Sequence, residues 1–299
     1  MSTTTEVASG AAPTTGINPE ALTRLLDVTP PRPRGGLTTW WSDTRVFAAR
    51  NLEHIRQIPE KLLDVTLQPI MFVLLFAFVF GGAIAVTGGS YREYLMGGII
   101  IQSLTFGLNG PATSMANDLT EGIVDRFRSL PARPSAYLSG HFVAELAGLA
   151  LSIVILLVTG LIVGWRVHSS VPEFALAIVL LLSYSAAMVW IGTWIGVIVR
   201  SADAVMGIAF TIVFPLTFIS NAFVPIQTMP KVLQYFAVWN PVSVVVQATR
   251  ELFGNPTTPT TLHSWPLEHA VPSSFAYCGI LLAVAVPMAL RRYRARTSD

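Results

Sequence analysis

The sequence predicts an all-α integral membrane protein, and three observations support that class. Hydrophobic residues make up 52% of the 299-residue chain and charged residues only 12%, whereas soluble domains carry about a quarter charged residues. Six uncharged runs of at least 20 residues follow one another along the chain, and each is long enough as a helix to cross about 30 Å of hydrocarbon. Runs such as VILLVTGLIVG do not alternate between polar and apolar residues, which argues against the strands of a membrane β-barrel.

We therefore expect six transmembrane helices, because helices satisfy their own backbone polar groups in lipid. The predicted spans are about residues 65–86, 94–117, 138–164, 174–199, 204–225 and 270–290. A further uncharged stretch, 232–249, is not counted as a seventh crossing, because Asn240-Pro241 interrupts it and proline breaks a helix. Residues 229–254 are instead predicted to form two short re-entrant helices in the outer leaflet, covered by protein.

The placement of basic residues predicts the orientation of the chain. With six crossings and the N-terminus inside, 15 of the 19 Lys and Arg residues lie on the cytoplasmic side, as the positive-inside rule requires. Both termini are thus expected in the cytoplasm. The single cysteine, Cys278, lies in the last predicted span, so no intramolecular disulfide is expected.

Two segments outside the spans have distinct compositions. Residues 1–38 are rich in Ser, Thr, Pro and Gly and are predicted to be a disordered cytoplasmic tail. Within residues 39–64, apolar residues such as Trp40 and Phe47 fall on one side of a helix and basic residues on the other. This pattern favours an amphipathic helix along the inner membrane surface, with an ordinary juxtamembrane helix as the alternative. Residues 293–299 form the predicted cytoplasmic C-terminus.

The segment DLTEGIVDRFRSLPARP, residues 118–134, is a charged island between the second and third spans. It holds six of the 36 charged residues in 17 positions. Its carboxylates, Asp118, Glu121 and Asp125, are spaced i, i+3, i+7 and share one helix face, while Phe127 lies on the opposite face. We predict a short cytoplasmic helix that fits a groove in a partner protein. A solvated turn that carries positive-inside arginines is the alternative.

A few residues within the spans are candidates for a role in translocation or conformational change. His141 and Glu145 are spaced i, i+4 near the cytoplasmic end of the third span, where a structural pair and a functional role are both open. The sequence LNGP, residues 108–111, and a proline in the fifth span predict kinks. The remaining candidates are Asn109, Pro111, Pro215, Asn221, Asn240 and Pro241.

The chain contains no pattern typical of catalysis. The two lysines, Lys61 and Lys231, follow Glu and Pro, so no phosphate-binding loop of the G-x-x-x-x-G-K-[ST] type is present. No metal-ligand spacing and no nucleophile–base arrangement occurs, which argues against a membrane transferase and against ATP hydrolysis by this chain alone. A secondary transporter driven by an ion gradient through His141 and Glu145 is the main rival, although such proteins place charged groups near the midplane.

Two segments resemble the permeases of ABC-2 type exporters, in particular the daunorubicin-resistance, multidrug-efflux branch. They are residues 118–134 and FISNAFVPIQTMPKVLQYFAVWNPVSVVVQATRELFGN, Phe218 to Asn255, and the likeness covers about Trp40 to Arg292. The resemblance implies a half-transporter in the plasma membrane of a bacterium. It would form a homodimer and work with two copies of a separate cytoplasmic ABC ATPase. It would export a hydrophobic or amphipathic drug, antibiotic, polyketide or lipid.

The resemblance also implies that the charged island is the element that docks on the ATPase. No cofactor is expected in this chain, because the ATPase would bind ATP and Mg²⁺, and no nucleic acid is expected as a partner. The family offers no equally clear motif for the substrate. The implied coupling residues are Asp118, Glu121, Gly122, Asp125, Arg126, Phe127, Arg128, Leu130, Pro131 and Arg133.

Overall fold

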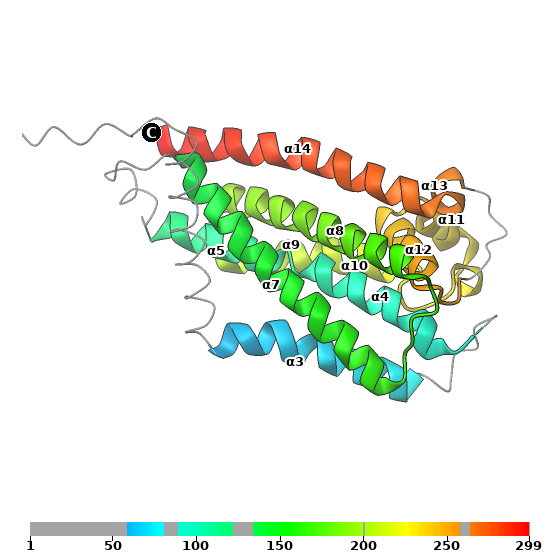
Figure 1. Ribbon diagram of the computed structural model, residues 1–299. Coiled ribbons are helices and arrows are strands. Elements are labelled where there is room, and N and C mark those ends of the chain that lie inside the picture. The colour runs from blue at the N-terminus through cyan, green and yellow to red at the C-terminus, as the bar shows by residue number, and fades with distance from the viewer. Residues whose placement is uncertain (1–58, 81–88, 122–133, 200, 258–263, 299) are drawn as a thin grey trace, which may run out of the picture.

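A computed structural model describes residues 59–80, 89–121, 134–199, 201–257 and 264–298. These residues form helices joined by turns and loops, with no strand among them, which confirms the all-α class. Figure 1 shows long helices side by side, with the short helices α11, α12 and α13 gathered at one end. The predicted tail and most of the predicted interfacial helix lie outside the described residues.

Within the described residues, three helices are long and apolar enough to cross a membrane. They are α7 (Pro134–Val163), α8 (Val171–Ile198) and α14 (Ala270–Ser298), and their apolar stretches are 27, 28 and 27 residues long. At 1.5 Å per residue each exceeds the roughly 30 Å of a hydrocarbon core. The chain is therefore a multi-pass membrane protein.

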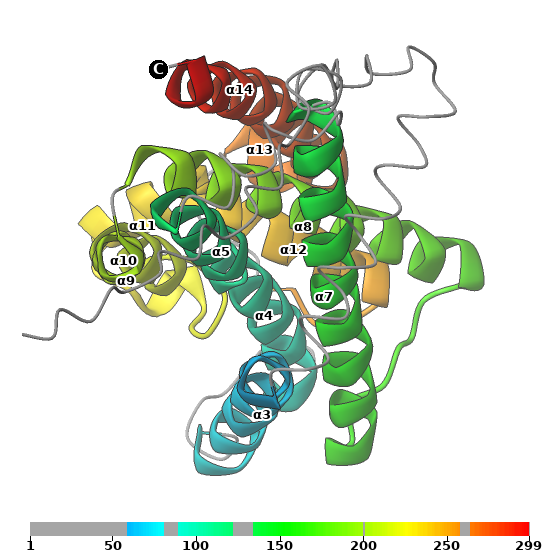
Figure 2. The same ribbon diagram turned by 90° about the vertical axis from the view of Figure 1, so that its left-hand side faces the viewer.

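The helix expected over 94–117 is interrupted. It consists of α4 (Tyr91–Phe106) and α5 (Asn109–Thr120), which run through the middle of the bundle in Figure 2. The interruption has a local cause, because Pro111 lacks an amide hydrogen and its ring crowds the carbonyl four residues earlier, that of Gly107. The central element is thus two helical segments joined at Gly107 and Leu108.

Two shorter apolar stretches each combine α-helix with a π-helical turn. The elements are α3 (Pro59–Leu75) with η1 (Phe76–Phe80), and α9 (Ala202–Ile208) with η2 (Ala209–Val213) and α10 (Phe214–Phe218). Helix α3 continues without interruption across residues 64 and 65, where the interfacial helix was predicted to give way to the first span. Pro215 lies in the first turn of α10, where the missing amide hydrogen costs little.

The predicted re-entrant region contains two short helices, α11 (Lys231–Trp239) and α12 (Pro241–Phe253). Asn240 separates them and caps α12, since its Oδ1 accepts a hydrogen bond of 2.9 Å from the amide of Val242. Pro241 occupies the first position of the helix, where its fixed φ is favourable. Nearby are two single turns, η3 (Ile226–Thr228) and α13 (Trp265–Glu268).

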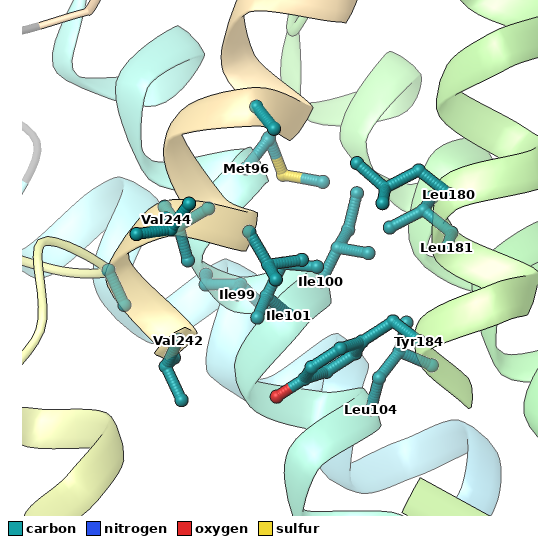
Figure 3. Close-up of a cluster of buried hydrophobic side chains, with 14 of the residues drawn as sticks. Met96, Ile99, Ile100, Ile101, Leu104, Leu180, Leu181, Tyr184, Val242 and Val244 are labelled. Carbon is teal, nitrogen blue, oxygen red and sulfur yellow. The ribbon is translucent and has the colours of Figure 1, made fainter. Parts of the chain in front are cut away.

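The main core forms where α4 lies between α8 and α12. Figure 3 shows Ile100 and Leu104 of α4 with Tyr184 of α8 and Val244 of α12, all at most 2% exposed. The Tyr184 hydroxyl hydrogen-bonds Thr105 Oγ1 at 2.8 Å, so the buried polar atoms satisfy each other. In lipid, close packing and such hydrogen bonds hold helices together.

Candidate functional site

The structure describes Asp118 and Glu121 of the predicted coupling residues. Glu121 is exposed and ends α5, its amide donating to the Asn117 carbonyl at 2.9 Å. Helix α5 therefore leads directly into the charged island, and α7 follows directly after it. The remaining coupling candidates lie outside the described residues, namely Gly122, Asp125, Arg126, Phe127, Arg128, Leu130, Pro131 and Arg133.

At the base of the charged island, three helices meet in the Tyr137 cluster, which we define as Asp118, Tyr137, His141 and Tyr293. The Tyr137 hydroxyl donates a hydrogen bond to Asp118 Oδ2, joining α7 to α5. The Tyr137 ring stacks on Tyr293 of α14, with centroids 6.0 Å apart and planes 15° apart. It also stacks on His141, with centroids 6.4 Å apart. The three rings are at most 3% exposed.

Apolar side chains surround this cluster and include Met115 of α5, Leu138 of α7 and Val197 of α8. A hydrogen bond from a hydroxyl to a carboxylate is charge-assisted and stronger than a neutral one, and it strengthens further in surroundings of low dielectric constant. The two helices that flank the charged island are therefore held together directly below it.

The other ionisable candidate, Glu145, lies beside the interruption between α4 and α5. A Cβ added to Gly110 would be 3.2 Å from Glu145 Oε2, so the carboxyl group lies against the start of α5, next to Asn109 and Pro111. His141, one helical turn away, stacks on Tyr137.

Helix α5 packs against α8 through glycine. A Cβ added to Gly192 would lie 2.3 Å from the Leu108 carbonyl oxygen, and one added to Gly196 would lie 2.4 Å from that of Ala112. The two glycines have the Gly-x-x-x-Gly spacing that lets membrane helices approach backbone to backbone. Any side chain at these positions would separate α5 from α8.

At the opposite end of the bundle, α12 carries a fully buried arginine. Arg250 Nε donates to the Tyr94 carbonyl at 2.7 Å, and Nη2 donates to the carbonyls of Asn221 and Ala222 at 2.8 and 3.0 Å. The guanidinium carbon lies 3.4 Å from the centroid of the Tyr94 ring, a cation–π contact. We call Tyr94, Asn221, Ala222 and Arg250 the Arg250 cluster.

The backbones in this cluster are also in close contact. A Cβ added to Gly98 of α4 would lie 1.8 Å from the Ala222 carbonyl oxygen, and the Tyr94 hydroxyl donates to the Asn221 carbonyl at 2.8 Å. Of this cluster, the sequence singled out Asn221 alone. Arg250 was predicted merely to be one of the four basic residues on the outer side. The signal for it was its place in a re-entrant element, since a charge there needs partners from the protein interior.

Asn240 joins the pair of helices α11 and α12 to α10. Its Nδ2 donates to the carbonyls of Leu216 and Ile219 at 2.7 and 3.0 Å, groups that the end of a helix leaves unpaired. Pro215 and Asn240 both line an open, largely apolar groove of about 730 Å³ between α10 and α11, a volume typical of sites for small molecules. The groove residues are Thr211, Ile212, Pro215, Leu216, Ile219, Tyr235, Phe236, Trp239 and Asn240.

The loop between α7 and α8 is fastened to the same end of the bundle. Trp165 Nε1 donates to Asn255 Oδ1 at 2.6 Å, and Asn255 Nδ2 donates to the Arg166 carbonyl at 2.9 Å. His168 Nε2 hydrogen-bonds Glu93 Oε1 at 2.9 Å. This bond from His168 holds the pKa of the Glu93 carboxyl below its ordinary value, because it stabilises the charged form.

The described residues form a helical, multi-pass membrane protein whose central helix is divided into α4 and α5. The sequence pattern of the family described as "ABC-2 type transporter" matches residues 42–253. The chain therefore belongs to this family, whose members are membrane transport subunits.

The chain is similar over most of its length to permeases of drug-resistance transporters, which confirms the resemblance drawn from the sequence. It is 28% identical over 257 residues to "Daunorubicin resistance ABC transporter permease protein DrrB1" of Streptomyces coeruleorubidus, covering 86% of this chain and 88% of the relative. It is 24% identical to "Doxorubicin resistance ABC transporter permease protein DrrB" of Mycobacterium tuberculosis, covering 84% and 88%. A more distant relative is "Putative transport permease ycf38" of Porphyra purpurea, 22% identical over 66% of this chain and 69% of the relative.

Proposed function

We propose that this chain is the permease subunit of an ATP-driven exporter, in which a separate ATPase docks on residues 118–134. The observation that carries the proposal is the bond between Tyr137 and Asp118 at the base of this segment. Because the bond ties α5 to α7, a force applied to the segment moves both helices together. The similarity to permeases named for daunorubicin and doxorubicin resistance supports the same role.

The contacts of α5 and α4 suggest how this displacement travels through the bundle. Helix α5 is packed on α8 at Gly192 and Gly196, whereas α4 is bound to α12 through Arg250. The interruption at Gly107 and Leu108 lies between these two contacts. Movement of the charged island is therefore converted into bending at this junction, while the Arg250 end keeps its geometry.

The exported molecule is hydrophobic or amphipathic and small, for example a drug, antibiotic, polyketide or lipid. The apolar groove between α10 and α11 supports this class, since Phe236 and Trp239 offer aromatic surface while Asn240 offers a polar group. Aromatic surface with few polar groups is typical of sites for such ligands. The groove lies at the Arg250 end, where the substrate leaves the protein.

The active unit contains two copies of this permease and two of the ATPase, with both termini in the cytoplasm. Two cytoplasmic termini require an even number of crossings. Six result if α7, α8 and α14 are joined by the divided helix of α4 and α5 and by two shorter crossings, α3 with η1 and α9 with η2 and α10. The arginine-rich end of α14, which contains Arg291 and Arg292, lies at the same end of the bundle as α5. That common location supports a cytoplasmic position for both.

Transport in membrane vesicles with a co-expressed ABC ATPase tests this function. We expect vanadate-sensitive, ATP-dependent movement of a hydrophobic antibiotic, and its loss in Arg126→Ala with Phe127→Ala at unchanged membrane abundance. Substitution of the exposed Val232 by Ala serves as the matched control. Wild-type transport by the double variant would remove the coupling role. Transport under an ion gradient without any ATPase would instead favour the secondary transporter that uses His141 and Glu145.

A further inference from the structure

The last turns of α14 contact the residues that flank the charged island. We propose that Tyr293 is a positioning residue for the coupling segment, which makes α14 a third component of the coupling site beside α5 and α7. This inference rests on the proposed function, because it assigns a role within energy coupling. It extends the site to a helix end that the sequence marked only as a cytoplasmic terminus.

Tyr293 is buried within a basic helix turn. Its neighbours Arg292 and Arg294 are exposed, while Tyr293 itself is 3% exposed. The positive-inside rule accounts for the arginines, but it does not require an aromatic ring among them. The ring is buried because it stacks on Tyr137, with centroids 6.0 Å apart and planes 15° apart, a favourable geometry for an aromatic pair.

A second contact fixes the end of α14 in place. Arg296 reaches the carbonyls of Ile198 and Val199 at 3.3 and 3.4 Å. These carbonyls belong to the end of α8, where no helical partner is available and a positive charge is favourable. Because these bonds are long and exposed, they hold the end of α14 less firmly than the buried stacking of Tyr293 on Tyr137 does.

The contacts form a continuous path from α14 to α5. The ring of Tyr293 touches that of Tyr137, and the hydroxyl of Tyr137 binds the carboxylate of Asp118. Asp118 precedes the end of α5, at Glu121, by less than one turn. Loss of the Tyr293 ring would remove one of the two rings that stack on Tyr137. Tyr137 would then be held less firmly, and the bond that joins α5 to α7 would weaken. The start of the coupling segment would then lose its fixed position.

Transport and ATPase measurements on the assembled complex test the functional part of this inference. For Tyr293→Ala we expect unchanged co-purification of the ATPase and basal ATP hydrolysis within about twofold of wild type. Substrate-stimulated hydrolysis and export should fall at least about tenfold. Tyr293→Phe keeps the ring and should retain export within about twofold. Ile280→Ala alters an exposed residue of the same helix and should also retain export within about twofold. Wild-type export by Tyr293→Ala, or a loss that merely follows reduced membrane abundance, would overturn the proposal.

A spin label at Glu121 tests the positioning directly and does not depend on ATP. Cys278 is the single cysteine of the chain, so Cys278→Ala with Glu121→Cys gives one labelling site on the exposed end of α5. We expect Tyr293→Ala to increase the mobility of this label and Tyr293→Phe to leave it unchanged. An unchanged spectrum in Tyr293→Ala would refute the positioning role even if export were lost. A changed spectrum, together with absence of ATP-driven export by the unlabelled wild-type chain, would uphold the positioning role and refute the proposed function.

Discussion

The Arg250 cluster and the Tyr137 cluster hold the two ends of the bundle together by different means. At the Arg250 end, a charged side chain binds three backbone carbonyls, and Gly98 allows two backbones to touch. At the Tyr137 end, stacked rings and one bond between side chains make the contact. A backbone carbonyl moves only with the segment of main chain that carries it, whereas a side chain can change its rotamer. The comparison indicates a rigid end and an adjustable end.

The interruption of the central helix separates these two ends. Helix α4 shares its buried surface with α12 and belongs to the rigid end, while α5 carries Asp118 and belongs to the adjustable one. A continuous helix would transmit every displacement of the charged island to Arg250. Division at Gly107 and Leu108 allows the two ends to move separately.

Replacement of Arg250 tests the rigid end and should have the largest effect. Arg250→Ala removes three charge-assisted hydrogen bonds to buried carbonyls, of which the Asn221 carbonyl keeps its bond from the Tyr94 hydroxyl, so we expect a loss of about 3 kcal/mol or more in unfolding free energy. Thermal unfolding in detergent and the amount of folded protein in membranes measure it. Arg92→Ala is the control, since Arg92 is exposed, donates a long bond of 3.5 Å to the Val163 carbonyl and lies 5.4 Å from the centroid of the Phe78 ring. Equal stability of the two variants would contradict the inference that the Arg250 cluster makes this end of the bundle rigid.

The packing of α5 on α8 should be the next most sensitive feature. Gly196→Leu places a side chain where the Ala112 carbonyl oxygen lies 2.4 Å from an added Cβ. Overpacking of this kind costs about 1–3 kcal/mol, and we expect lower thermal stability together with impaired export. Gly279→Leu introduces the same side chain at a position with no neighbouring atom within 4 Å. If both variants behaved alike, the close approach of α5 and α8 would not be required.

Asn240 makes two contacts, the cap of α12 and the bonds to α10, whose contributions to stability can be measured separately. Asn240→Ala removes both the cap of α12 and the donor to α10, while Asn240→Asp retains an acceptor for the cap and removes the donor. Loss of a cap costs about 0.5–2 kcal/mol, so the alanine variant should be less stable than the aspartate variant by roughly that amount. Thermal unfolding of both at neutral pH measures the difference. An aspartate variant as unstable as the alanine variant would show that the donor dominates.

Loss of the contact between Glu93 and His168 should have the smallest effect on stability, and this effect should depend on pH. Because the pKa of Glu93 is lowered in the folded protein from its ordinary value of 4.5, its contribution is present above that value and is lost as the pH falls through the lowered pKa. Unfolding temperatures measured across this range should decline less in Glu93→Gln than in wild type. Glu268→Gln, an exposed carboxyl group, is the control. Identical acid sensitivity of Glu93→Gln and wild type would mean that the contact is not stabilising.

The sequence predicted features that depend on local chemistry. The helices α7, α8 and α14 followed from uncharged runs whose length the membrane dictates, and the interruption before Pro111 followed from the missing amide hydrogen of proline. Six crossings stay a prediction, since α3 and α9 with α10 are shorter than the three long helices. The helical island at residues 122–133 also stays a prediction, because it lies outside the described residues.

Features that depend on contacts between distant segments could not be predicted. The burial of Arg250 requires Gly98 and Ala222 to meet, and these residues are more than a hundred positions apart in the chain. The position of Arg250 in the predicted re-entrant element indicates that its charge needs partners, but the local pattern does not identify them. Tyr293 was missed for a related reason, since the surrounding arginines are explained by membrane orientation and its partner Tyr137 lies on a different helix.

The bonds from Asn240 to Leu216 and Ile219 close a loop in the chain. The residues between Ile219 and Asn240 leave α10 and return to the same point, and two near their start, Asn221 and Ala222, are held against α4 by Arg250. A change of length or composition near the exposed Gln227 and Thr228 would therefore leave α10 and α12 in register. A change at Asn221 or Ala222 would instead disturb the Arg250 cluster, so the same loop combines a fixed start with a tip that is free to vary.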